Sequence, residues 1–107
     1  MQTLIQVACN RAGSLRDAIV NDRRLGRFKL VVSEKKRGTR SSGWAKIHGT
    51  SDDGYGAINV QWLASSKVLL CRVVTRGSNP GPISGDFLRY LMSCHLRRIQ
   101  AIHIVTG

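Results

Sequence analysis

Three stretches of the chain follow the pattern of a β-strand, in which every second side chain is apolar and faces a core. In residues 27–33, for example, large apolar side chains recur at every second position. Residues 67–75 form a near-continuous apolar run, which is typical of a central strand covered on both faces. The predicted strands are residues 27–33, 44–49, 57–63 and 67–75.

Two further segments have apolar residues at helical spacing. Ser14 precedes residues 15–24 and can cap a helix there. Ser84 precedes residues 85–98 in the same way and predicts a second helix. Two prolines and two glycines interrupt residues 76–83, which predicts a long connection ahead of that helix.

The last segment, residues 99–106, alternates again and predicts a final strand. The resulting order is α-β-β-β-β-α-β. This order indicates an α+β fold, a small single domain over residues 1–107 with a four-stranded, mainly antiparallel meander, a C-terminal strand and two helices on one face. A right-handed crossover through the second helix would place the last strand parallel to the fourth.

The composition limits the size of the core and the compartment that we expect for this domain. A chain of 107 residues with 42% hydrophobic residues is large enough to build one core. Its apolar runs are far shorter than the roughly 20 residues that cross a membrane, and residues 1–9 lack the features of a signal peptide. Three widely spaced cysteines, Cys9, Cys71 and Cys94, predict reduced thiols rather than disulfides or a zinc site. We therefore expect an intracellular, cytoplasmic protein with no membrane partner, cofactor or metal.

The charge of the chain points to its partner. Lys and Arg total 17 against 6 Asp and Glu, which gives a net charge of +11. Such a domain attracts polyanions, and Arg, which outnumbers Lys by 12 to 5, forms forked hydrogen bonds to phosphate. We therefore expect a nucleic acid, DNA or RNA, contacted mainly through its phosphate backbone.

The cations are concentrated in residues 23–46, which hold nine of the seventeen. Residues 35–43 are polar, basic and rich in small residues, so they predict a mobile hairpin tip that clamps phosphates. Trp44 lies at the base of this tip, where it could stack on an unpaired base. The predicted binding residues of this segment are Arg23, Arg24, Arg27, Lys35, Lys36, Arg37, Arg40, Trp44 and Lys46.

A second predicted contact is an arginine stripe on the second helix, formed by Arg89, Arg97 and Arg98. Cations near the end of a helix also complement its dipole, so this stripe has a structural explanation as well. The glycines of residues 77–85 lack the Gly-Lys-Ser/Thr ending of a phosphate-binding loop and predict a structural turn. Trp62 is predicted to be a core residue, because tryptophan is highly buried on average.

Two enzyme classes are alternatives to simple binding, although we assign no catalytic residue. A metal-dependent nuclease would use Asp22 with Glu34 and Lys36 as a Glu-x-Lys set. A metal-free ribonuclease would use His48, His95 and Glu34 as its acid and base. Six acids and three histidines in the whole chain offer few ways to build either site.

A protein-interaction module is the alternative outside nucleic-acid chemistry. A small basic domain can bind or inhibit an acidic protein, because opposite charges attract over long distances. An exposed edge of the predicted sheet could also pair with another copy of the chain and form a homodimer.

Overall fold

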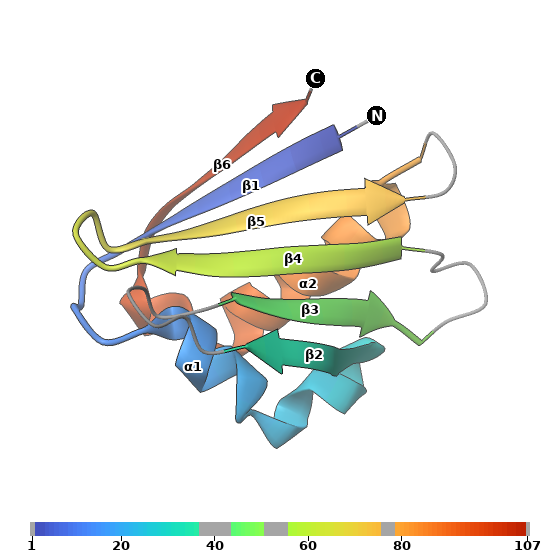
Figure 1. Ribbon diagram of the computed structural model, residues 1–107, viewed down its shortest axis with the longest axis horizontal. Helices are drawn as coiled ribbons and strands as arrows, with labels where there is room; N and C mark the ends of the chain where they lie inside the picture. The colour runs from blue at the N-terminus through green and yellow to red at the C-terminus, as the bar shows by residue number, and fades with distance from the viewer. Residues whose placement is uncertain (1, 37–43, 51–55, 76–78, 107) are drawn as a thin grey trace.

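The computed structural model describes residues 2–36, 44–50, 56–75 and 79–106, and Figure 1 shows their arrangement. Within these residues, six strands form one sheet against which the helices pack. In chain order the elements are β1 (Gln2–Cys9), α1 (Leu15–Val20), the 3-10 helix η1 (Arg23–Phe28), β2 (Leu30–Lys36), β3 (Trp44–Gly49), β4 (Gly56–Leu63), β5 (Val68–Thr75), α2 (Gly81–Cys94), the 3-10 helix η2 (Leu96–Arg98) and β6 (Ile99–Thr106).

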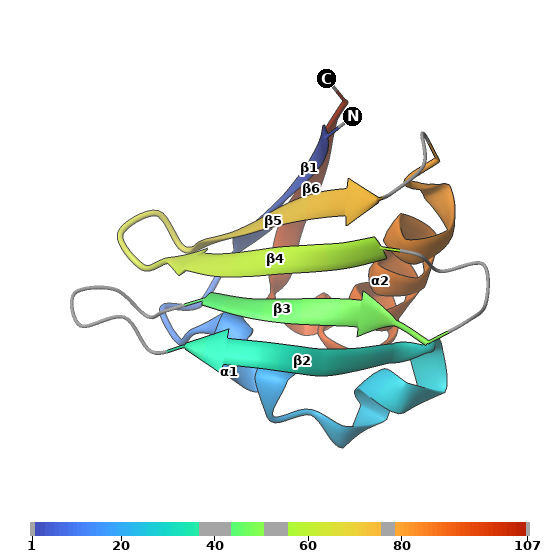
Figure 2. The ribbon, with the colours of Figure 1, turned by 45° about the vertical axis from the view of Figure 1, so that its right-hand side comes forward.

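The sheet has the strand order β2-β3-β4-β5-β1-β6, and all of its described pairings are antiparallel. The predicted α+β class is confirmed, and the four predicted strands form the expected meander from β2 to β5. In Figures 1 and 2 the helices lie behind the sheet, while its other face, which we call the open face, carries no helix.

The sequence analysis missed the strand β1. Its odd-numbered side chains Thr3, Ile5, Val7 and Cys9 are buried, and the strand pairs with β5 on one side and β6 on the other. The alternation is hard to recognise in the sequence, because apolar residues such as Leu4 also lie on the other face. The element order therefore begins with a strand, and the sheet has two strands beyond the predicted meander.

The last strand runs parallel to the fourth, as expected, but the two strands are not neighbours in the sheet. β6 pairs antiparallel with β1, with Ile104 opposite Ile5. Because β1 is antiparallel to both β5 and β6, these two strands run in the same direction with β1 between them. The strand β1, which was not predicted, thus lies between the fourth predicted strand and the last.

The expectation that the fourth strand is covered on both faces was also wrong. Leu69, Cys71 and Val73 of β5 are buried against the helices, whereas Arg72 and Val74 are exposed on the open face. The apolar run of this strand therefore reflects a central position in the sheet with one covered face.

The first helix is shorter than predicted. Ser14 caps α1 as expected, and its hydroxyl oxygen accepts a hydrogen bond from the backbone nitrogen of Asp17 at 3.1 Å. The helix ends at Val20, and Asp22 then caps η1, which places Arg23 and Arg24 in the 3-10 helix. Lys29 ends η1 in the left-handed region with φ 60°, so β2 starts at Leu30, three residues later than predicted.

The second helix begins earlier than predicted. α2 starts at Gly81, and Pro82 lies in its first turn, where a proline costs no intrahelical hydrogen bond. The predicted cap, Ser84, therefore lies inside the helix, with its backbone nitrogen bonded to the Pro80 carbonyl at 3.1 Å. α2 ends at Cys94, so Arg97 lies in η2 and not on the helix.

The core lies between the sheet and the helices. Aromatic side chains of α2, Phe87 and Tyr90, are fully buried against apolar residues of the central strands. Trp62 belongs to the same cluster, so its predicted core position is confirmed. Cys9 and Cys71 are buried free thiols, as expected, and burial raises the pKa of both. The helix layer thus covers one face of the sheet and leaves the other open.

Candidate nucleic-acid interface

The strand register places two rows of side chains across the open face. The first row runs from Trp44 on β3 through Gln61 and Leu70 to Gln6 on β1. The second row lies next to it and runs from Lys46 through Asn59 to Arg72. Neighbouring strands lie about 4.8 Å apart, so the backbones at Lys46 and Arg72 are roughly 10 Å apart.

A shallow depression of about 310 Å³ lies between these rows. Its lining combines one indole, two side-chain amides, one guanidinium and aliphatic groups, from Trp44, Asn59, Val60, Gln61, Leu70 and Arg72. An indole can stack on a base, an amide can bond to a base edge, and a guanidinium can bond to phosphate. The depression therefore offers the three kinds of contact that a nucleotide uses.

Trp44 is held in place from the helix side of the sheet. Arg16 of α1 is almost completely buried, and its Nη2 donates a hydrogen bond to the Trp44 carbonyl at 3.0 Å. The Trp44 side chain itself is half-buried on the open face. This contact fixes the first residue of β3, directly after the basic residues that precede it in the chain.

Three aspartates of the helix layer, Asp17, Asp22 and Asp86, each have an arginine partner. Arg16 pairs with Asp17 at 2.7 Å, Arg24 with Asp22 at 2.9 Å, and Arg89 with Asp86. These pairs neutralise two predicted binding residues, Arg24 and Arg89.

Among the side chains that the structure describes on the open face, we find Lys46 and Arg72 and no carboxylate. Glu34, whose side chain lies outside the description, is the cross-strand partner of Lys46.

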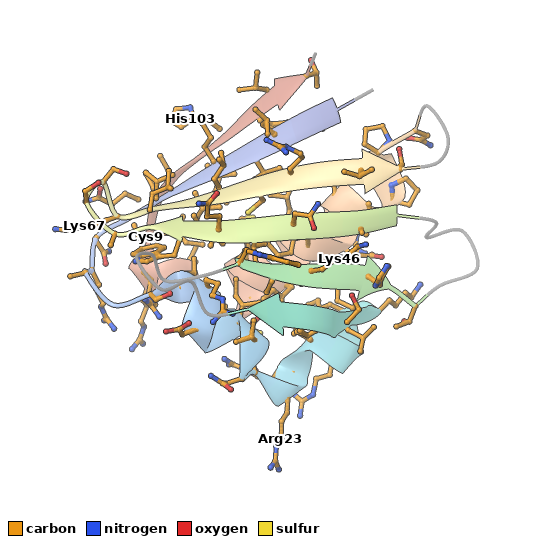
Figure 3. The ribbon with its side chains drawn as sticks, viewed as in Figure 1. Cys9, Arg23, Lys46, Lys67 and His103 are labelled. Atoms are coloured by element: carbon orange, nitrogen blue, oxygen red, sulfur yellow. The ribbon has the colours of Figure 1, made fainter. Side chains whose placement is uncertain are left out.

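The structure separates the other predicted binding residues. Figure 3 shows Arg23 extending from η1, well away from Lys46 on the sheet. Arg27 lies on the same 3-10 helix and is exposed. Of the hairpin residues, Lys35 and Lys36 end β2, with Lys36 opposite Trp44 in register. The remaining two predicted hairpin cations, Arg37 and Arg40, lie outside the described residues.

Arg97 belongs to a second depression, on the helix layer, with a volume of about 480 Å³. Arg11 and Arg98 also line it, and Arg98 donates a hydrogen bond to the Gly13 carbonyl. The predicted stripe of Arg89, Arg97 and Arg98 is therefore divided between an ion-paired residue on α2 and two arginines on η2.

Sequence reasoning missed Arg72, Asn59 and Gln61. The useful signal was Arg72, a lone charged residue within an apolar strand, because a charge at such a position marks an exposed face. The amides gave no signal of their own, since they alternate with buried residues on any strand with one solvated face.

The histidines needed for a metal-free ribonuclease are not brought together. His48 lies on the open face, opposite Val31 and Ala57. His95 is buried at the end of α2, on the helix side of the sheet. The sheet therefore separates the two residues.

A group of ionisable side chains in contact with one another lies around Asp22. Its Oδ2 accepts a hydrogen bond from the Tyr90 hydroxyl at 2.8 Å, and the same hydroxyl contacts His95 Nε2 at 2.8 Å. The hydrogen bond from Arg24 lowers the pKa of Asp22, whereas burial lowers the pKa of His95 and raises that of Tyr90. These hydrogen bonds join η1 to α2. Because the Asp22 side chain is only 7% exposed, the network leaves little room for a ligand.

The part of the chain that the structure describes contains neither a candidate metal site nor a candidate membrane-spanning helix. No three His, Cys, Asp or Glu side chains gather there in an arrangement that could hold a metal ion. None of the described helices has the length and apolar character needed to cross a membrane. Searches against models of protein families, curated proteins and solved structures found no match to this chain.

Proposed function

We propose that this protein binds single-stranded segments of nucleic acid on the open face of its sheet. The observation that carries the proposal is the depression in which Trp44, two amides and Arg72 lie together on the open face. Proteins that bind single strands combine such a stacking platform with cations that follow the backbone.

Trp44 would provide the stacking platform. A half-buried indole is rigid, so it loses little conformational entropy when a base packs on it. Base stacking on an aromatic side chain contributes about 1–3 kcal/mol per base and tolerates any sequence. Asn59 and Gln61 would bond to base edges or sugars next to it.

Lys46 and Arg72 would contact the phosphate backbone. They lie in one row on either side of Asn59, so a strand crossing β3, β4 and β5 could reach both. The basic residues Lys35, Lys36, Arg37 and Arg40 directly precede Trp44 in the chain and would extend the positive field. Contact would be made mainly to phosphate, which is the source of most salt-dependent affinity. Three free cysteines agree with the cytoplasmic location that we propose for this function.

Fluorescence anisotropy with labelled single- and double-stranded DNA and RNA, at two salt concentrations, tests the proposal. Replacing Trp44 with Ala should weaken single-strand binding by about 1–3 kcal/mol. Arg72→Ala should weaken it and reduce the salt slope by about 0.7, the value for one lost phosphate contact. Arg97→Ala, which removes the same charge from the helix layer, is the matched control and should leave affinity within about twofold.

If Arg97→Ala instead weakens binding more than the other variants do, the nucleic acid binds on the helix layer, which would contradict the proposal. Equal competition by polyglutamate would instead favour the alternative partner, an acidic protein, because a polypeptide has no bases to stack on Trp44.

A further inference from the structure

The two edges of the sheet differ in how they are protected. One edge is β2, which ends in Lys35 and Lys36 and has a register shift between Val32 and Glu34. Terminal lysines and a bulge are the features that keep an edge strand from pairing with another chain. The other edge, β6, has eight residues, and its pairing with β1 is regular from Ala101 to Thr106.

The exposed edge is also apolar and uncharged. No Lys, Arg, Asp or Glu occurs between Ile99 and Thr106, although the chain as a whole carries a charge of +11. Ile104 and Val105 are 52% and 47% exposed, and they point to opposite faces of the sheet because they are adjacent in a strand. A long, uncharged, apolar edge strand that remains uncovered is a site for strand pairing.

We propose that β6 pairs antiparallel with β6 of a second copy of this chain, forming a symmetric dimer. A second copy fits this edge because a two-fold axis matches the free backbone N–H and C=O groups of β6 with an identical row. Charge also favours this edge: two chains of +11 repel one another, and β6 brings no cation into the contact.

The side chains indicate the register. In such a dimer the open faces of the two sheets lie on the same side, and so do the two faces covered by helices. Residues that are opposite each other across the axis must therefore have side chains on the same face of the joined sheet. With the axis at His103, each Ile104 lies opposite Ile102 of the second copy, and each Val105 opposite Ala101. This register covers the exposed apolar groups on both faces.

Such a dimer would join two six-stranded sheets into one continuous sheet. Because the axis is perpendicular to the sheet, both open faces would lie on the same side. Two depressions lined by Trp44 would then be available to one long strand, and two linked sites bind more tightly than one. The dimer itself does not depend on the proposed function, since its contacts involve β6 alone.

Sedimentation of nuclease-treated protein at high salt tests the dimer in the absence of nucleic acid. The wild-type chain should sediment as a dimer that dissociates on dilution, and Ile104→Lys should sediment as a monomer. The matched control is Val31→Lys, which changes a side chain of the other edge that is 47% exposed, and it should remain dimeric. Circular dichroism confirms that both variants fold.

Cross-linking tests the register. Residues directly opposite in an antiparallel pair have Cα atoms about 4.5–5.5 Å apart, which suits a disulfide. His103→Cys should therefore give a covalent dimer on oxidation, and Val31→Cys should not. A wild-type chain that is monomeric at every concentration would overturn the dimer, as would dissociation by Val31→Lys but not by Ile104→Lys. A dimer in which His103→Cys fails to cross-link would overturn this register.

Discussion

At the scale of single residues, buried polar groups connect the helices to one another. Asp22 caps η1 and pairs with Arg24. It also accepts a hydrogen bond from the hydroxyl of Tyr90 on α2, and the Nε2 atom of His95 lies 3.2 Å from Asp22 Oδ2. These contacts are possible because α1 ends at Val20, which leaves Asp22 free to turn toward α2.

This network makes stability depend on pH through His95. Burial lowers the pKa of His95 in the folded protein below its unfolded value near 6.5. As the pH falls below that value the unfolded chain binds a proton that the folded chain does not, so the free energy of unfolding should decrease. Urea unfolding at about pH 7.5 and about pH 5.5, which bracket that value, should show the loss, and His95→Gln should reduce it. A wild-type protein that is equally stable, or more stable, at the lower pH would contradict this prediction.

Some residues could be placed from the sequence, and others could not. Trp62 was assigned to the core from its residue type and the apolar residues spaced two apart on its strand, and it is buried there. Trp44 was predicted to be available for stacking, and it lies half-buried on the open face beside Lys46 and His48. Asp22 could not be recognised, because its partners Tyr90 and His95 are more than sixty residues away in the chain.

At the scale of elements, the central position of β1 has consequences for stability. The strand is hydrogen-bonded on both sides, and Ile5 is fully buried between the sheet and the helices. Removing most of such a side chain costs both hydrophobic transfer energy and a cavity.

Replacing Ile5 with Ala should therefore lower the free energy of unfolding by about 2–4 kcal/mol. The matched control is Val74→Ala on β5, which shortens a side chain that is exposed on the open face. Its effect should stay within about 0.5 kcal/mol. Urea unfolding of the two variants measures the difference, and similar values for both would show that β1 is not a central strand.

The elements also show where periodicity was sufficient and where it failed. The meander was recognised because its first three strands alternate, its fourth is a short apolar run, and polar turn residues separate each strand from the next. β1 was not predicted, because apolar side chains lie on both of its faces. The start of β2 was placed too early, because the pattern of apolar residues does not reveal the left-handed turn at Lys29. Strand order depends on pairings between distant segments, which periodicity does not encode.

At the scale of the whole molecule, the two layers differ in their electrostatics. Asp17, Asp22 and Asp86 of the helix layer are each paired with an arginine, so that layer contains both signs of charge. The open face carries Lys46 and Arg72 beside an exposed part of Trp44. The excess of cations was evident from composition, whereas the face on which a base could stack became evident only from the register of the strands.

NMR titration of the labelled protein with a single-stranded oligonucleotide would show whether nucleic acid binds across the open face. We predict that the resonances of the Trp44 indole and of the side-chain amides of Asn59 and Gln61 shift first and most, together with those of backbone amides of β3, β4 and β5. Shifts confined to α2, η2 and the group of Arg11, Arg97 and Arg98 would contradict this prediction, because those residues lie on the helix layer.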